Sequence, residues 1–216
     1  MCPVRLLIAD DHEVVRRGLR ALLQEQSEWQ VVAEAVNGSD AVAKASELLP
    51  DVAILDITMP SLNGLDAAKR ISKLSQRTKI LILTMHESDQ LIQNALDAGA
   101  SGYLNKTDAG RDLVMAVKAL LSNKTFFTSS AARRLTGGLL GNGRKTPETK
   151  RSELTARERE IVQLLAEGKG SKEMATLLGL SVKTVETHRS HILRKLNCHS
   201  VTELVRYAVH NHLIEA

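Results

Sequence analysis

The stretch Asp51-Val-Ala-Ile-Leu-Asp-Ile-Thr-Met-Pro-Ser-Leu-Asn-Gly64 decides the fold of this chain. Its small or apolar residues 52–55 predict a strand buried on both faces, which is typical of parallel sheets covered by helices. Asp56 follows directly, and residues 59–64 then break the strand pattern. We therefore expect Asp56 at the carboxyl end of a strand, where open α/β sheets place their ligand sites.

The same alternation runs through the N-terminal half of the chain. Apolar segments that predict strands, each followed by the apolar spacing of a helix, lie at residues 4–9, 30–35, 52–55, 79–84 and 102–104. This repeat predicts an α/β unit with a five-stranded parallel sheet, right-handed crossovers and helices on both faces.

Chemically informative residues stand at the ends of these strands. Asp10 and Asp11 follow the first strand, Asp56 the third and Lys106 the fifth, and Thr84 ends the fourth. Any one aspartate alone fits an ordinary turn or cap residue. Together the carboxylates repel one another, which favours a hard cation such as Mg²⁺ among them. A carboxylate beside Mg²⁺, a hydroxyl and an ammonium is suited to phosphoryl transfer onto an aspartate.

Four motifs give this half a family resemblance. They are Ala-Asp-Asp-His at 9–12, Leu-Asp-Ile-Thr-Met-Pro at 55–60, Leu-Thr-Met-His at 83–86 and Gly-Tyr-Leu-Asn-Lys at 102–106. Through them, residues 1–121 resemble the receiver domain of bacterial two-component response regulators, which has a flavodoxin-like topology. The resemblance implies that Asp56 accepts phosphate from a sensor histidine kinase. It also implies that Asp11, Asp56 and the backbone carbonyl of Thr58 hold Mg²⁺, with Asp10 reaching the metal through water.

The resemblance further implies a switch. Lys106 would pair with the phosphoryl oxygens, and Thr84 would move toward the phosphoryl group and let Tyr103 turn inward. Two positions depart from the common receiver pattern: Met85 follows the threonine where a small residue is usual, and Thr107 follows the lysine where proline is usual. We expect Met85 to slow access to Asp56 and Thr107 to loosen the following loop.

The composition excludes several classes of protein. With 43% hydrophobic and 25% charged residues, the chain is not of the disordered class. No apolar run approaches the roughly 20 residues of a membrane helix, and the N-terminus lacks the pattern of a signal peptide. Cys2 and Cys198 are the only cysteines, so no disulfide framework is indicated. We expect a cytoplasmic protein without membrane contact.

The charge is distributed unevenly. Residues 1–121 carry 13 Lys or Arg against 16 Asp or Glu, whereas residues 122–216 carry 16 against 9. A basic C-terminal part beside an acidic N-terminal part indicates that the C-terminal part meets a polyanion, and nucleic acid is favoured over membrane.

Residues 122–152 predict a flexible linker, since residues 136–151 are rich in Gly, Thr and charge and lack any period. Within them, Gly138-Leu-Leu-Gly-Asn-Gly-Arg-Lys-Thr146 nearly matches the sequence motif of a phosphate-binding loop. The lysine is displaced by one position and no strand precedes the first glycine, so we expect no nucleotide site.

Residues 153–216 predict a small all-α domain of four helices. The first opens with a capping box at Thr155 to Glu158, and glycines separate it from a shorter second helix that ends at Gly179. Ser181 caps the third helix, 182–196, and a second capping box at 200–203 opens the last. The third helix has an apolar stripe and an opposite face of short polar and basic side chains, which fits a reader of the DNA major groove.

Three further motifs resemble the LuxR-type helix-turn-helix: Leu154-Thr-Ala-Arg-Glu-Arg-Glu160, Lys172-Glu-Met-Ala175 and residues 181–196. The whole chain is therefore similar to NarL-type response regulators. The resemblance implies that Glu186, Thr187 and Ser190 read base edges, with Lys183, Thr184 and Arg194 toward the DNA backbone. It also implies that the last helix, through Leu204, Val205 and Ala208, pairs two copies on an inverted repeat.

The sequence thus predicts a DNA-binding transcription regulator, switched by phosphorylation of Asp56 and dimeric when phosphorylated, and not an enzyme. One alternative is an aspartyl-phosphate hydrolase of small phosphate esters, which typically has a second aspartate where this chain has Thr58. Another is an unswitched DNA-binding protein with a degenerate receiver. A zinc site at His188, His191, Cys198 and His199 is disfavoured, because no tetrahedral ligand spacing appears.

Overall fold

The computed structural model describes residues 3–85, 88–128, 131, 154–211 and 213–214. The chain divides into two compact units, residues 1–143 and 144–216, and each unit has hydrophobic core residues of its own. Most of the predicted linker, including the phosphate-loop-like stretch, lies outside the described residues. Among the described helices, none has the length and apolar character needed to cross a membrane.

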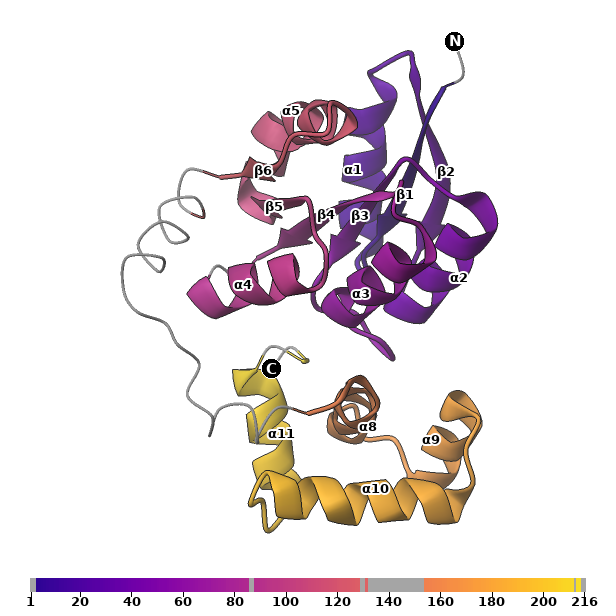
Figure 1. Ribbon diagram of the computed structural model, residues 1–216, viewed down its shortest axis with the longest axis vertical. Helices are drawn as coiled ribbons and strands as arrows, with labels where there is room; N and C mark the ends of the chain where they lie inside the picture. The colour runs from indigo at the N-terminus through magenta and orange to yellow at the C-terminus, as the bar shows by residue number, and fades with distance from the viewer. Residues whose placement is uncertain (1–2, 86–87, 129–130, 132–153, 212, 215–216) are drawn as a thin grey trace. The chain divides into compact units, whose positions relative to one another are not determined.

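The N-terminal unit is built on a parallel sheet (Figure 1). The five predicted strands are present as β1 (Val4–Ala9), β2 (Trp29–Ala35), β3 (Val52–Asp56), β4 (Lys79–Thr84) and β5 (Gly102–Asn105). They are arranged in the order β2-β1-β3-β4-β5, which is the order of flavodoxin-like folds. The predicted fold class is confirmed, and Asp56 is the last residue of the central strand.

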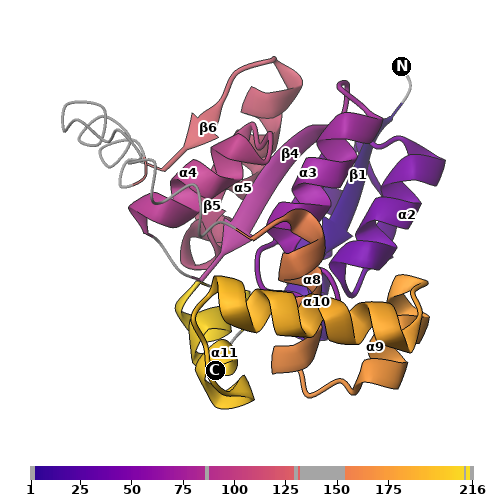
Figure 2. The same ribbon diagram turned by 60° about the horizontal axis from the view of Figure 1, so that its bottom comes forward.

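Helices cover both faces of this sheet (Figures 1 and 2). One face packs against α1 (Glu13–Gln24) and α5 (Ala109–Leu121), and the other against α2 (Gly38–Leu48), α3 (Gly64–Leu74) and α4 (Asp89–Asp97). Successive side chains of a strand point to opposite faces of the sheet, so the apolar residues of each strand are divided between a hydrophobic core on one face and a second core on the other. Leu6, Ile8 and Ile54 face α1 and α5, whereas Leu7 and Leu55 face the other three helices.

The predicted number of strands was too low by one. Phe126–Phe127 forms a sixth strand, β6, which pairs parallel to β5 and lies within the range predicted as linker. Its two residues are too few to show an alternation of side chains, so the sequence pattern could not reveal it. Gly102 permits β6 to approach β5 closely, because a Cβ at position 102 would lie 3.2 Å from the backbone oxygen of Phe126 and 2.8 Å from Leu81 Cδ1.

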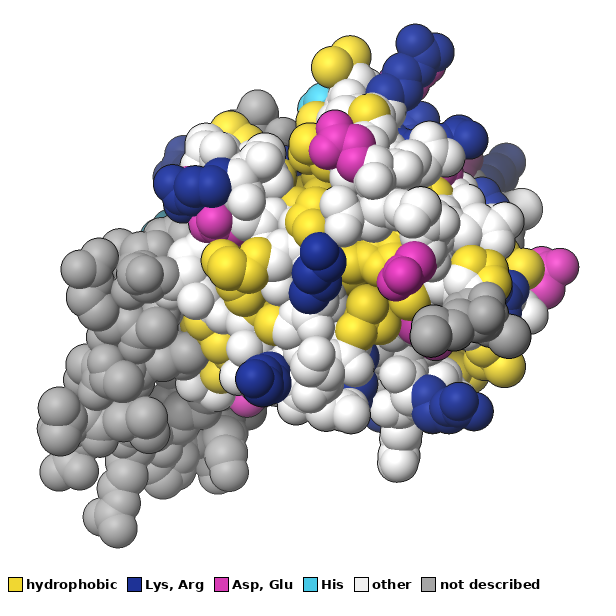
Figure 3. All heavy atoms as spheres, turned by 90° about the horizontal axis from the view of Figure 1, so that it is seen from above, with side chains coloured by type: hydrophobic (Ala, Val, Ile, Leu, Met, Phe, Trp, Pro, Cys, Tyr) yellow, Lys and Arg dark blue, Asp and Glu magenta, His cyan; other side chains and the backbone are white. Residues whose placement is uncertain are grey.

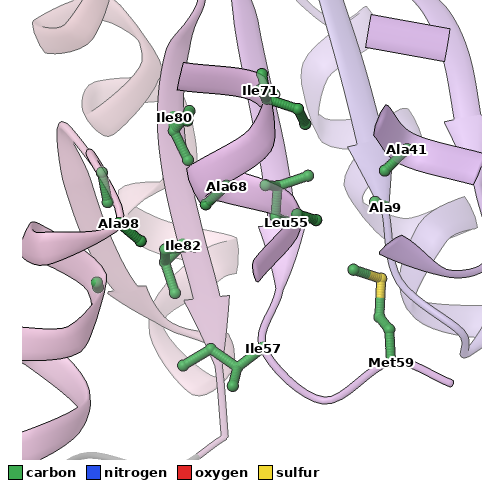
Figure 4. Packing of buried hydrophobic residues seen from close by; sticks show 14 of the residues in the cluster. Ala9, Ala41, Leu55, Ile57, Met59, Ala68, Ile71, Ile80, Ile82 and Ala98 are labelled. Carbon is green, nitrogen blue, oxygen red and sulfur yellow. The ribbon is translucent and has the colours of Figure 1, made fainter. Parts of the chain in front are cut away.

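The loop after β3 is fixed by burial of its apolar residues. Ile57, Met59 and Leu62 are each at most 2% exposed, and Figure 4 shows Ile57 and Met59 with their side chains turned into the core. The N–H of Gly64 donates to the backbone oxygen of Ile57 at 2.8 Å. A Cβ on Gly64 would lie 1.8 Å from the backbone oxygen of Asp56, so only glycine fits at this close approach. The loop therefore holds Asp56 at the sheet edge.

The face of the N-terminal unit that is seen in Figure 3 carries side chains of all kinds. In Figure 3, Lys and Arg side chains stand at separate points among hydrophobic, acidic and neutral ones. Exposed large hydrophobic side chains include Val14 and Met115.

The C-terminal unit has the four predicted helices, α8 (Ala156–Ala166), α9 (Ser171–Leu178), α10 (Val182–Lys195) and α11 (Val201–His210). The predicted capping box at α8 is present, and the side chains of Ser181 and Ser200 cap α10 and α11. One expectation about α11 was wrong. Leu204 and Ala208 are buried in the core of this unit and are at most 1% exposed, so these two residues are not available to pair a second copy.

Candidate functional site

The predicted acidic cluster forms at the carboxyl ends of β1, β3 and β5. Asp10 and Asp56 are at most 2% exposed, and Lys106 follows β5 at the start of a short 3-10 helix, Lys106–Asp108. The Lys106 Nζ lies 2.8 Å from Oδ2 of Asp10 and 2.8 Å from Oδ2 of Asp56. One ammonium thus bridges two buried carboxylates, while Asp11 stays exposed beside them.

The charge balance of this cluster shifts the ionisation of Asp56 and Lys106. Burial, together with the smaller effects of Asp10 and Asp11, raises the pKa of Asp56 to about 7 despite the opposing effect of Lys106. Burial lowers the pKa of Lys106, but the carboxylates of Asp56 and Asp10 outweigh this effect, so the pKa lies above its usual value of 10.5. The cluster therefore carries more negative charge than a single lysine neutralises.

The donor set suits a hard divalent cation. Ligand atoms of Asp10, Asp11, His12 and Asp56 all lie within 4.8 Å of one another. Within the described residues, Oδ2 of Asp10 and Oδ2 of Asp56 have no partner other than the Lys106 ammonium. Several carboxylate oxygens with an exposed side open to water are the coordination that Mg²⁺ prefers. The residues present therefore fit the predicted metal.

The other predicted receiver residues lie in β4 and β5 or within two residues after the ends of β3, β4 and β5. Thr84 ends β4, is 1% exposed, and is in register with Asn105 of β5. Thr58 lies two residues after Asp56 in the loop and is half-buried. The side chain of Tyr103 is fully buried. Met85 is 53% exposed, and the N–H and Oγ1 of Thr107 both donate to Oδ1 of Asn105.

Two residues that support the cluster were not assigned a role from sequence. The N–H of His12 donates to Oδ1 of Asp10 at 2.9 Å, and its Nδ1 lies 2.8 Å from Oδ1 of Asp11. Arg16, one turn into α1, donates from Nη1 to the backbone oxygen of Asp10 at 2.9 Å, and its Nε lies 3.7 Å from Glu34. The adjacency of His12 to the aspartate pair was a usable signal, but nothing in the sequence singled out Arg16 from Arg17.

The predicted DNA-reading face is open on α10. Five of the six predicted residues are exposed and Thr184 is half-buried; the exposed ones are Lys183, Glu186, Thr187, Ser190 and Arg194. The hydroxyls of Thr184 and Ser181 lie 2.8 Å apart, which ties Thr184 to the helix cap. Val185 and Ile192 on the opposite side are fully buried against the rest of the unit. The helix is thus held by its apolar stripe and presents short polar and basic side chains to solvent.

Comparisons with known proteins identify the families that the two units resemble. The model of the response regulator receiver domain matches residues 6–118, and that of the bacterial regulatory proteins of the luxR family matches residues 152–208. The oxygen regulatory protein NreC of Staphylococcus epidermidis is 40% identical over 98% of this chain and its own full length. The chain belongs to the NarL-type response regulators.

Solved structures of response regulators are similar over nearly the whole chain. The Salmonella typhimurium response regulator RcsB is 28% identical, with a TM-score of 0.59, over 96% of this chain and 98% of its own. A structure of two RcsB dimers bound to two parallel DNAs is also 28% identical, with a TM-score of 0.58, over 95% of this chain and 97% of its own.

Family membership decides whether the chain is an enzyme or a transcription regulator. This response regulator has a receiver domain and a LuxR-type DNA-binding domain, and both matched models describe regulatory proteins. It is a DNA-binding transcription regulator, not an enzyme that turns over small phosphate esters. The hydrolase alternative is thereby excluded.

Proposed function

We propose that this regulator is switched by phosphorylation of Asp56 and that the phosphorylated form binds paired DNA half-sites as a homodimer. The observation that carries the proposal is the position of Asp56 at the end of the central strand, close to Asp10, Asp11 and Lys106. We also propose a receiver over residues 1–121, a linker over 122–152 and a DNA-binding domain over 153–216.

In this proposal the phosphoryl group passes from a histidine of a sensor kinase to a carboxylate oxygen of Asp56. The N–P bond of the phosphohistidine breaks as the new O–P bond forms. The ammonium of Lys106 is within 2.8 Å of Asp56 and is placed to offset charge on the phosphoryl oxygens. Thr84 donates its hydroxyl to the phosphoryl group, and Tyr103 responds to its displacement.

Asp11, Asp56 and the backbone carbonyl of Thr58 would hold Mg²⁺, with Asp10 in contact through water. Bound there, Mg²⁺ supplies positive charge that offsets the negative charge of the carboxylates and of the incoming phosphoryl group. His12 orients the aspartate pair through its contacts with Asp10 and Asp11.

On DNA, α10 would enter the major groove. Glu186, Thr187 and Ser190 are proposed to contact base edges, and Lys183, Thr184 and Arg194 the phosphate backbone. The proposed partners are a sensor histidine kinase, double-stranded DNA and a second copy of the chain. The proposed location is the cytoplasm, where the sensor histidine kinase and the DNA are both accessible to this protein.

Intact mass and duplex binding, measured on the same full-length samples with Mg²⁺ and an acyl phosphate, test the switch. Asp56→Asn removes the proposed acceptor, and Asp51→Asn is the matched control, because Asp51 precedes the same strand at its other end and is exposed. We expect one added phosphoryl group and tighter binding to a selected inverted repeat for wild type and Asp51→Asn only. Binding of DNA without phosphate on any variant would mean that the receiver is regulated in another way.

A further inference from the structure

Glu158 makes contacts that a helix cap does not require. As the third residue of α8 it accepts the N–H of Thr155 at 2.8 Å, which is the ordinary role of a glutamate in a capping box. The same carboxylate lies 2.7 Å from Nζ of Lys195 and 3.2 Å from Nδ1 of His191. Both of these residues belong to α10, the proposed recognition helix.

The position of these contacts on α10 is informative. His191 and Lys195 are four residues apart, so they lie one above the other on one edge of the helix. That edge adjoins the proposed DNA face, since His191 follows Thr187 by one turn and Lys195 follows Arg194 directly. A single carboxylate that holds two successive turns limits both the rotation of α10 about its axis and its shift along that axis.

The environment of Glu158 makes the contact firm. Glu158 is 5% exposed, although it is ionised. Burial by itself raises the pKa of Glu158, but the hydrogen bonds from Lys195 and Thr155 outweigh this effect and lower the pKa to about 2. If Lys195 turned away to meet a DNA phosphate, it would leave a buried carboxylate without its cation, which is strongly unfavourable.

We propose that Glu158 is a positioning residue for DNA recognition, which sets α10 on α8 through Lys195 and His191 and keeps Lys195 away from the DNA phosphates. This inference rests on the proposed function of α10 as the DNA reader. It distinguishes Lys195 from its neighbour Arg194, which is exposed and free to reach a phosphate.

The chain offers a matched control. Glu173 is the third residue of α9 and accepts the N–H of Gly170 at 2.9 Å, so it occupies the equivalent position in the neighbouring helix. Its charged neighbour is Lys169 of the preceding turn, at 4.0 Å, and not a residue of α10. Glu173→Gln therefore perturbs a helix start without touching the recognition helix.

The test uses the full-length chain and a duplex selected by the wild type from a random library, with a scrambled duplex beside it. Affinity for both is measured over a range of salt for the wild type, Glu158→Gln, Lys195→Met, the double variant and Glu173→Gln. We expect Glu158→Gln and Lys195→Met each to lower the ratio of selected to scrambled affinity roughly tenfold, the size of effect of one lost base contact.

Four results separate a positioning role from other roles. The salt dependence of binding should be unchanged in Lys195→Met, whereas loss of a phosphate contact lowers the slope by about one. The double variant should be no worse than either single one. Glu173→Gln should keep the wild-type ratio, and amide exchange of α8 should show that Glu158→Gln leaves this helix folded.

Other outcomes overturn the inference. A reduced salt slope in Lys195→Met would make Lys195 a direct phosphate contact. An unchanged ratio in both single variants, or an equal loss in Glu173→Gln, would leave Glu158 with a capping role only. If the wild type selects no duplex, the proposed function of α10 as the DNA reader fails. If the wild type and its variants all bind the selected duplex with the same preference, only the proposed role of Glu158 fails.

Discussion

The ammonium of Lys106 lies 2.8 Å from a carboxylate oxygen of Asp56, and it reaches Asp10 at the same distance. One buried ammonium is therefore shared by two buried carboxyl groups, and no other Lys or Arg of the described residues forms an ion pair with either side chain. The N-terminal unit depends on Lys106 for stability as well as for the proposed chemistry.

Lys106→Met is accordingly expected to destabilise the N-terminal unit by about 3–5 kcal/mol in the absence of divalent cations, because it leaves buried charges unpaired. Mg²⁺ should recover more stability in this variant than in wild type. Urea unfolding followed by the fluorescence of Trp29, the single tryptophan, reports on this unit alone. Lys118→Met, an exposed lysine on α5, should unfold as wild type does.

Arg16 and Arg17 are adjacent on α1 but differ in burial. The Arg16 side chain is 13% exposed and donates to the backbone oxygen of Asp10, whereas that of Arg17 is 78% exposed and pairs with Glu13. Arg16→Met should lose about 1.5–3 kcal/mol of stability and weaken Mg²⁺ binding measured by calorimetry. Arg17→Met should change stability by about 0.5 kcal/mol or less. Equal effects of the two would show that Arg16 does not hold Asp10.

Gly64 and Gly18 should respond oppositely to alanine. A Cβ on Gly64 would meet the backbone oxygen of Asp56, so Gly64→Ala should cost about 3 kcal/mol or more and displace Asp56. Gly18 lies within α1 with nothing within 4 Å of a Cβ, so Gly18→Ala should stabilise by up to about 1 kcal/mol. Thermal unfolding of both variants, with phosphate uptake at Asp56, checks the prediction.

Acid should weaken the C-terminal unit through Glu158. The pKa of Glu158 is about 2 in the folded unit against an ordinary value of 4.5, so the folded state holds the ionised form more strongly. The stability from this group is therefore fully present above pH 4.5 and is lost as the pH falls toward 2. Between pH 4.5 and pH 2, the free energy of unfolding measured by circular dichroism should fall by about 2 kcal/mol less in Glu158→Gln than in Glu173→Gln.

Residues on the two parts of the α10 face should affect DNA binding differently. Arg194→Met should weaken binding to all duplexes alike and lower the salt slope by about one, as expected of a phosphate contact. Thr187→Ala should keep the slope but lose about 1–3 kcal/mol of preference at one base pair. A titration of each variant against single-base-pair substitutions of the selected site separates the two results.

Much of the fold and of the candidate site follows from local sequence. Buried apolar runs such as residues 52–55 identify strands by composition alone, and parallel strands bring their carboxyl ends to one edge. This reasoning is enough to place Asp10, Asp56 and Lys106 together. The apolar stripe of α10 likewise determined which side of that helix is exposed.

Apolar residues at helical spacing do not show whether they pack within their own chain or against a second copy. The spacing of Leu204 and Ala208 fits a dimer contact as well as it fits packing within one chain, and only the tertiary structure placed both residues in the core. Strand β6 was not predicted for a related reason, because its two residues are too few to show an alternation of side chains.

The sequence by itself determined the order of elements and the polar face of α10, because each depends on residues near one another along the chain, and it determined the acidic edge of the sheet, because parallel strands end at one edge. Only the tertiary structure decided which partners these residues take. Lys106 is shared between Asp10 and Asp56, Arg16 rather than Arg17 holds the backbone of Asp10, and Glu158 reaches Lys195 across 37 positions. Such pairings depend on how helices and strands pack in three dimensions, and residue spacing along the chain does not encode them.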